Sequence, residues 1–262
     1  MKILVLMRMV PDVVEELEVA ADGKTLDASV LRMILNERDD HALEQALILK
    51  ERHGGTVTLV ALDTPEIDDV LFTAMAKGAD RAVKITGVEG SLSTAAAAHR
   101  FAKTLPTVAG VWPADLALTG VQAIDDLDGW MAPLLARLLN LAYVGVVTRV
   151  TIDASLKTAV VLREYAGGVR AELDVALPAI LGIQAAEKPP RYVPVAKVRA
   201  AMKSKKIESI GVQVAEPPAA LEVLGMAKPQ TAGHAEMLAG SSEEIAATLC
   251  DIFAKIGLTQ GR

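Results

Sequence analysis

The first two-thirds of the chain alternate between short apolar runs and longer segments in which apolar residues have a helical spacing. Continuous apolar runs at residues 2–10, 56–62 and 178–183 predict strands that are covered on both faces. Between them, "HALEQALILKERHG" and "WMAPLLARLL" place apolar residues three and four positions apart, which predicts helices. Repeated strand and helix units predict an α/β fold with a doubly wound, Rossmann-like, mostly parallel sheet.

The signals for helix ends fit this pattern. Thr64, Pro65 and Glu66 predict a helix start, with a capping hydroxyl, a proline in the first helical position and an acid in the first turn. Residues 36–40 offer further capping side chains just before "HALEQALILKERHG". We therefore expect helices to begin at both places.

The pattern changes after Tyr143. Three β-rich segments follow, with "AGG" at residues 166–168 as a hairpin turn, and they predict a β-hairpin added to the sheet. Beyond Gln184 a proline-rich connector leads to a short basic helix, and Ser241 and Glu244 have the spacing of a capping box at the start of a last helix. We divide the chain into a Rossmann-like domain at residues 1–184 and an extended C-terminal arm at residues 185–262, which embraces either this domain or a partner.

Composition narrows the range of functions. The chain has 33 acidic and 27 basic residues, a formal charge of −6 and only 3% aromatic residues, so we expect no nucleic-acid partner. The basic residues between positions 197 and 206 fit docking to an acidic protein surface better than RNA binding. One cysteine excludes a disulfide framework and a cysteine-based zinc site. The first apolar run is too short for a secretory signal, no run is long enough for membrane insertion, and we expect a cytoplasmic protein.

The stretch "GVQAIDDLDG", residues 120–129, lies between a predicted strand and a predicted helix and contains three aspartates. These aspartates could cap the helix, bind magnesium in a hydrolase, or belong to a nucleotide-binding loop. A Walker phosphate loop and the G-x-G-x-x-G fingerprint are both missing, which argues against an ordinary ATPase or nicotinamide dehydrogenase. Ligands of doubly wound sheets lie at the carboxyl ends of strands, and amides beyond Gly129 could hold a phosphate there.

The same sheet edge is expected to gather the end of the first strand, residues 36–39, the turn after residue 62 and residues 120–131. The four histidines lie on different predicted elements, so neither a metal site nor a catalytic residue is predicted.

Five blocks, in order along the chain, resemble the β subunit of electron-transfer flavoproteins. They are "LNERDDHALEQALILKE", "AMAKGADRAVKI", "GVQAIDDLDG", "VLREYAGGVRAELDVALPAIL" and "PPRYVPVAKVRAAMKSKK". The resemblance implies a heterodimer with an α subunit that carries the redox-active FAD. It also implies AMP or, as in electron-bifurcating members, a second FAD in this subunit, and docking to partner dehydrogenases. The chain would then be an electron-carrier subunit and not an independent catalyst.

Carried over to this sequence, the resemblance implies two sets of site residues. The nucleotide would contact Leu6, Asn36, Glu37, Arg38, Asp39, Leu62, Gly120, Val121, Gln122, Ala123, Ile124, Asp125, Gly129, Trp130 and Met131. The dehydrogenase would contact Arg191, Tyr192 and Val195, in a partner-recognition loop at the start of the arm.

Three departures leave the ligand and the partner open: Glu37 replaces a proline, Val195 a leucine and Trp130 a smaller polar residue. A stand-alone adenine-nucleotide sensor of the universal-stress type is the alternative function.

Overall fold

The structure is a computed structural model that describes residues 1–87, 92–126, 129–153, 155–212, 222–229, 233 and 235–258. The chain forms two compact units, Met1–Gly225 and Met226–Arg262, which we describe separately. The expected functional division at residue 184 is a different boundary, and it stays a prediction.

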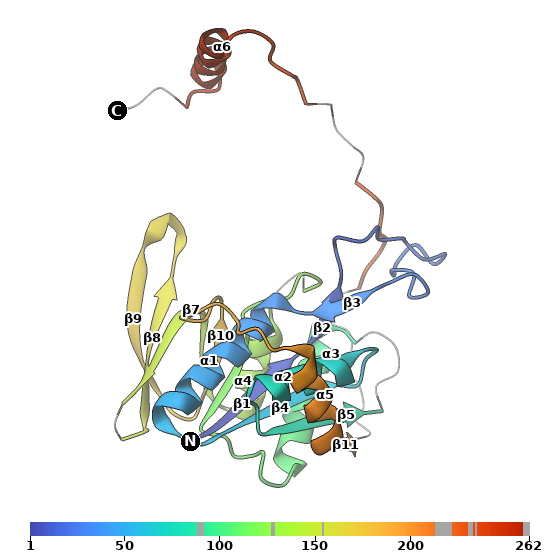
Figure 1. Ribbon diagram of the computed structural model, residues 1–262, viewed down its shortest axis with the longest axis vertical. Coiled ribbons are helices and arrows are strands. Elements are labelled where there is room, and N and C mark those ends of the chain that lie inside the picture. Colours follow the sequence, from blue (N-terminus) through green and yellow to red (C-terminus); the bar gives the residue numbers. More distant parts are fainter. Residues whose placement is uncertain are drawn as a thin grey trace. The chain divides into compact units, whose positions relative to one another are not determined.

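Within the described residues, the larger unit is built on a nine-stranded sheet in the order β11-β5-β4-β1-β6-β10-β7-β8-β9 (Figure 1). The pairs from β11 to β7 are parallel, whereas β8 is antiparallel to both β7 and β9. This confirms the predicted mostly parallel, Rossmann-like sheet with a β-hairpin addition. The strands are β1 Lys2–Met7, β4 Thr56–Leu62, β5 Arg81–Thr86, β6 Leu116–Gly120, β7 Ala142–Ile152, β8 Thr158–Glu164, β9 Arg170–Ala176, β10 Ala179–Ile183 and β11 Ile207–Gly211.

Helices cover both faces of this sheet. Along β1, Ile3 and Val5 pack with α1 and α2, whereas Leu4 and Leu6 pack with α3 and α4 on the opposite face. This strict alternation explains why β1 reads as a continuous apolar run. The helices are α1 Glu37–His53, α2 Ile67–Lys77, α3 Thr94–Thr104, α4 Met131–Leu139, α5 Val195–Ser204 and α6 Ser242–Lys255, with 3-10 turns η1 Leu105–Thr107 and η2 Ala166–Gly168.

The first predicted strand is interrupted. β1 ends at Met7, and after Arg8 the chain forms β2 (Met9–Pro11), which pairs antiparallel with β3 (Met33–Leu35) in a separate two-stranded sheet. The prediction of one strand over residues 2–10 was therefore wrong at Arg8. The interruption places Arg8 at the carboxyl edge of the main sheet.

The start predicted for α2 was also wrong. The helix begins at Ile67, and Glu66 before it has a left-handed backbone with φ of 65°. The Thr64 hydroxyl oxygen is buried and makes no hydrogen bond, so it does not cap the helix. The favourable local signal was overridden by the turn at Glu66.

The smaller unit contains α6. Its predicted capping box is present: the Ser241 hydroxyl accepts from the Glu244 N–H, and the Glu244 carboxylate accepts from the Ser241 N–H. No residue of α6 is buried, and Cys250 is exposed. Among the described residues, no helix is long and apolar enough to cross a membrane.

Candidate functional site: a pocket at the switch point of the sheet

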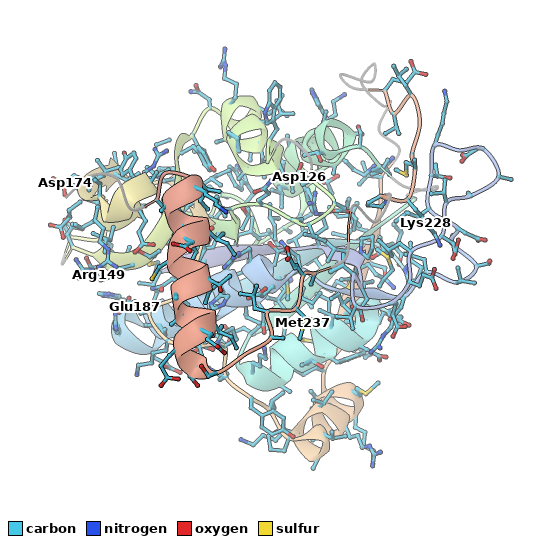
Figure 2. The ribbon with its side chains drawn as sticks, turned by 90° about the horizontal axis from the view of Figure 1, so that it is seen from above. Asp126, Arg149, Asp174, Glu187, Lys228 and Met237 are labelled. Atoms are coloured by element: carbon cyan, nitrogen blue, oxygen red, sulfur yellow. The ribbon has the colours of Figure 1, made fainter. Side chains whose placement is uncertain are left out.

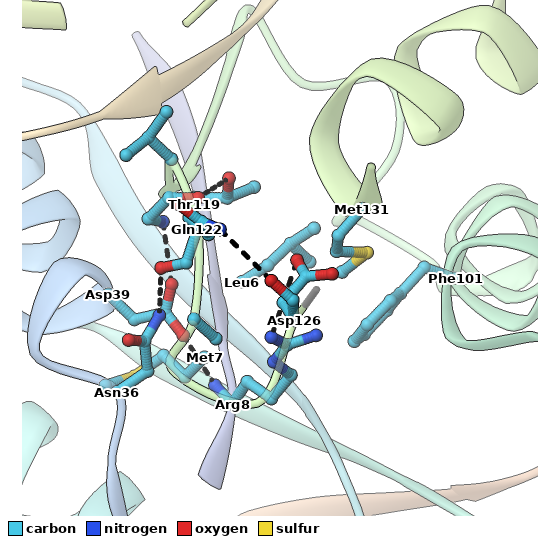
Figure 3. A pocket seen from close by; sticks show the side chains of 13 residues that line it. Leu6, Met7, Arg8, Asn36, Asp39, Phe101, Thr119, Gln122, Asp126 and Met131 are labelled. Carbon is cyan, nitrogen blue, oxygen red and sulfur yellow. Dashed lines mark hydrogen bonds and ion pairs between the residues drawn. The ribbon is translucent and has the colours of Figure 1, made fainter. Parts of the chain in front are cut away.

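The candidate site lies where the order of the strands reverses. β1 has β4 on one side and β6 on the other, so the loops after β1 and β6 diverge to opposite faces and leave a crevice at their carboxyl ends. A pocket occupies this place (Figure 3). It is lined by Leu6, Met7, Arg8, Asn36, Asp39, Phe101, Thr119, Gly120, Val121, Gln122, Ala123, Asp126 and Met131.

Asp39 ties two strand ends together beneath this pocket. Its carboxylate accepts from the Arg8 N–H at 2.9 Å and from the Gly120 N–H at 2.7 Å. Burial raises the pKa of Asp39 to about 6, although the Arg8 charge and the hydrogen bonds from Gly120, Asn36 and Arg8 each lower it. Burial therefore disfavours the charged form of Asp39, and the carboxylate joins the ends of β1 and β6 through these two hydrogen bonds.

Gly120 is the point of closest approach between β6 and α1. A Cβ atom on this residue would lie 2.6 Å from the Arg38 Cβ, 2.7 Å from the Asp39 carboxylate and 2.9 Å from the Arg38 backbone carbon. Because one of these atoms is backbone, the neighbour has no simple way to move. A side chain here would separate Asp39 from the loop after β6.

Arg8, the residue directly after β1, holds the acidic loop that contains Asp125 and Asp126. The Arg8 guanidinium lies 3.1 Å from Asp125 and 3.6 Å from Asp126. Asp126, which Figures 2 and 3 label, is buried. It also accepts from the hydroxyl of Thr94, the first residue of α3, at 2.9 Å. Gln122 donates to the Asp126 carbonyl at 3.1 Å, which closes the loop on itself. The N-cap position of α4 belongs to Trp130, which makes no side-chain cap bond.

The structure brings part of the predicted nucleotide set together. The residues of that set that line the pocket are Leu6, Asn36, Asp39, Gly120, Val121, Gln122, Ala123 and Met131. The others lie around it: Arg38 donates to the Gln184 carbonyl at 2.7 Å, Asp125 pairs with Arg8, and Leu62 packs in the core on the α3 and α4 face. Ile124 and Trp130 are exposed. Asp128 lies outside the described residues.

The sequence did not single out Arg8, Met7, Phe101 or Thr119 as lining residues. Arg8 carried the one available signal, since it is a charged residue inside the first apolar run. Phe101 comes from α3, whose place beside the pocket depends on the folded sheet and not on any local motif. Among the described residues, no group of three or more histidine, cysteine or acidic side chains is placed to hold a metal ion.

The predicted docking residues lie elsewhere, between β10 and α5. Tyr192 is 84% exposed and Val195 is 60% exposed, whereas the Arg191 side chain turns back onto α1 and pairs with Glu44 and Glu51. The structure therefore separates the three residues into two that face solvent and one that faces the protein.

Comparison with known proteins relates the chain to one family. The model of the electron transfer flavoprotein domain family matches residues 25–217. The electron transfer flavoprotein subunit beta of Methylophilus methylotrophus is 30% identical over 262 residues, which cover 96% of this chain and 97% of that protein. The subunit beta of Bacillus subtilis is 33% identical over 206 residues, with 79% and 76% covered, and that of Bradyrhizobium diazoefficiens is 30% identical over 234 residues, with 87% and 90% covered.

The chain belongs to the electron transfer flavoprotein β-subunit family. Its match with the Methylophilus protein extends over nearly its full length, so the larger unit and the C-terminal arm both fall within the family likeness. Membership assigns the chain a role in electron transfer. The fold and the motifs from which the resemblance was recognised agree with this assignment.

Proposed function

We propose that this chain is the β subunit of a heterodimeric electron transfer flavoprotein. In this role it holds AMP or a second FAD in the pocket between β1 and β6. It helps to pass electrons between dehydrogenases and an acceptor through the FAD of an α subunit. The observation that carries the proposal is the pocket at the switch point of the sheet. It is lined by residues from two of the segments predicted to contact the nucleotide, residues 36–39 and 120–131.

The walls of the pocket fit an adenine nucleotide. Leu6, Met7, Phe101, Val121 and Met131 offer apolar surface for a base. Asn36 precedes α1, whereas Thr119 and Gln122 lie on β6 and the loop directly after it. These three residues add polar groups suited to base edges or ribose hydroxyls. A flavin bound in the complex supplies the electron-carrying chemistry, whereas AMP would supply none.

The charges of the pocket favour a ligand with few exposed phosphates. Arg8 already lies beside Asp125 and Asp126, and Asp39 adds a further carboxylate below it. At the start of α4, Met131 and Ala132 have N–H groups without acceptors inside the helix, but Pro133 has none to offer. These amides are suited to bind an anion, and the carboxylates of Asp125 and Asp126 in the same loop disfavour a triphosphate.

The surface between β10 and α5 is the proposed dehydrogenase-docking surface. Tyr192 and Val195 present apolar groups to solvent, and Lys197 and Arg199 follow on exposed positions of α5. Lys205 is not part of this surface, because its ammonium group donates to the carbonyls of Met75 and Ala79 at the end of α2. The surface suits a partner with an apolar pocket and an acidic rim.

Residues 226–262 are the proposed attachment to the α subunit. Leu249, Ile252 and Phe253 on α6 have the spacing of a single apolar stripe, which continues at its C-cap residue Ile256, and all four are exposed. A single helix cannot bury such a stripe by itself, so this unit is suited to a partner's surface.

The test is to express the chain with its α subunit, purify the complex and denature it. FAD and AMP released per heterodimer are then measured by chromatography. One flavin with one AMP supports a simple carrier, and two flavins support a second FAD in this subunit.

Two results would contradict the proposal. A chain that stays monomeric in the presence of the α subunit but releases an adenine nucleotide is a stand-alone nucleotide-binding domain. If the FAD of the α subunit is the only nucleotide in the complex, the proposal that this subunit binds a nucleotide is wrong.

A further inference from the structure

The connector between β10 and α5 lies along one side of α1. Its first residues follow the helix from the amino-terminal end, with the Gln184 carbonyl accepting from Arg38 at 2.7 Å and the Ala186 N–H donating to His41 Nδ1 at 3.2 Å. The next contact uses Gln45, whose side chain accepts from the Glu187 N–H at 3.1 Å. Three successive turns of α1 thus bind the connector.

Glu187 makes the first ion pair of this arrangement (Figure 2 labels it). Its two carboxylate oxygens accept from the Arg52 guanidinium at 2.9 and 2.8 Å, and Gln45 donates to one of them at 3.0 Å. Burial alone would raise the pKa of Glu187, but the hydrogen bonds from Arg52 and Gln45 lower it. The folded protein therefore favours the charged form.

Arg191 makes the second ion pair, with opposite polarity. Its backbone N–H, Nε and Nη2 all donate to the Glu44 carboxylate, at 2.8 to 3.1 Å, and Nη1 donates to Glu51 at 2.6 Å. The Glu44 side chain is 4% exposed, so its charge depends on Arg191 for compensation. A buried carboxylate left without its partner costs several kcal/mol.

These contacts decide which way the neighbouring side chains point. Residues 191–194 belong to no helix or strand, and their exposure alternates along the chain. Arg191 and Val193 turn inward, and Tyr192 between them is exposed. Pro189, Pro190 and Pro194 further restrict the backbone.

We propose that Arg191 is a positioning residue, which Glu44 holds so that Tyr192 and Val195 are presented in one fixed arrangement before any partner binds. This rests on the proposed docking function of the connector. Arg191 is poorly suited to bind a partner's carboxylate directly, because Glu44 and Glu51 already occupy its donors and would repel a third carboxylate. The pair instead removes the ordering cost that a mobile loop would incur on docking.

We call the pair of Glu44 and Arg191 the clamp, because it holds the connector on α1. Glu44→Gln in the full-length chain tests the clamp and leaves Arg191 available as a trypsin site. We expect cleavage between Arg191 and Tyr192 to become about tenfold faster or more, because the segment must open locally before it is cut. Hydrogen exchange of the Glu187 and Arg191 amides should accelerate with it. Glu51→Gln is the matched control, since it removes a carboxylate from the exposed end of the same pair, and it should change cleavage less than about twofold.

A charge exchange provides a second test that does not depend on Glu44. Arg52→Glu alone should accelerate exchange of the Glu187 amide, and the double variant Arg52→Glu with Glu187→Arg should restore slow exchange. Unchanged cleavage and exchange in Glu44→Gln and in Arg52→Glu, with wild-type unfolding midpoints, would overturn the clamp.

Docking is then measured in the complex with the α subunit, using any dehydrogenase that reduces the wild-type complex. Glu44→Gln should raise the KM for that dehydrogenase about tenfold with kcat within about twofold, as expected for lost pre-organisation. If the connector of Glu44→Gln opens but the KM is unchanged, the positioning role is overturned. The conclusion that the pair of Glu44 and Arg191 holds the connector on α1 would still stand. Flavin and AMP content, measured on the same samples, reports separately on the proposed function.

Discussion

Helices α1 and α6 have similar sequences at their ends but opposite fates in the fold. Both begin with acidic residues in the first turn and end with basic residues in the last. Yet nine residues of α1 are buried, among them Leu43, Leu47 and Leu49, and none of α6 is. The two helices therefore share the same signals at their ends, whereas burial depends on what each helix packs against.

Under the proposed function, this difference divides the protein into a part that has its own core and a part that a partner would cover. α1 packs on the sheet, sets Asp39 under the pocket and holds the connector, so one helix supports both proposed sites. α6 is stabilised by its capping box, and its apolar stripe is exposed.

The largest effect is expected from deletion of residues 226–262. Association with the α subunit should weaken by at least about 100-fold, near 3 kcal/mol, because the apolar stripe is lost. The thermal unfolding midpoint of the remaining chain should stay within about 2 °C of that of the full-length chain, since the larger unit has its own core. Titration calorimetry and thermal unfolding measure the two quantities. Intact association, or a large fall in the midpoint, would remove the distinction between the two parts.

Truncation of equivalent leucines should show the same contrast at single residues. Leu43→Ala in α1 should lower the free energy of unfolding by about 3 kcal/mol, because it empties space in a closed core. Leu249→Ala in α6 should change it by less than about 0.5 kcal/mol in the isolated chain. Equal effects in urea unfolding would mean that α6 is packed on its own chain.

The pH dependence of stability should reveal Asp39. Its pKa is raised to about 6 in the folded protein, so its protonated form is favoured there and its contribution to stability falls as pH rises from about 4 to 7. A shift of about two units corresponds to about 3 kcal/mol at most. Asp39→Asn cannot titrate, so the stability of wild type relative to this variant should decline over that range in urea unfolding. A flat or rising difference would show that Asp39 is not strained by burial.

Gly120→Ala should lower the free energy of unfolding by about 1–3 kcal/mol, because the added methyl group meets α1. It should also weaken adenine-nucleotide binding, since it separates Asp39 from the loop. Gly211→Ala is the control, because a Cβ there meets only the Thr86 hydroxyl at 3.5 Å. Calorimetric binding of AMP and urea unfolding compare the two variants, and equal behaviour would contradict the close packing at Gly120.

The sequence predicted the bounds of a main-sheet strand well when that strand is buried on both faces. β4 was expected at residues 56–62 and spans Thr56–Leu62, and the capping box of α6 was read directly from Ser241 and Glu244. β11, in contrast, is a short strand with "IESIG" that exists because it pairs with β5, more than 100 residues earlier. Such pairing has no local signature.

The candidate site was only partly predictable for the same reason. Gly120, Gln122 and Asp39 lie in motifs that can be recognised, and they meet in the pocket. Arg8 was missed because it looked like part of a strand, and its role appears only when the acidic loop folds over it. Glu44 and Arg191 are far apart in the sequence, so their pairing could not be inferred from spacing.

The contrast between α1 and α6 can be tested most directly by hydrogen–deuterium exchange on the full-length chain, alone and in complex with the α subunit. We expect α1 amides to be protected in both states. The amides of α6 should exchange rapidly in the free chain and become protected in the complex. Protection of α6 in the free chain, or no gain of protection in the complex, would contradict the assignment of residues 226–262 to the α-subunit interface.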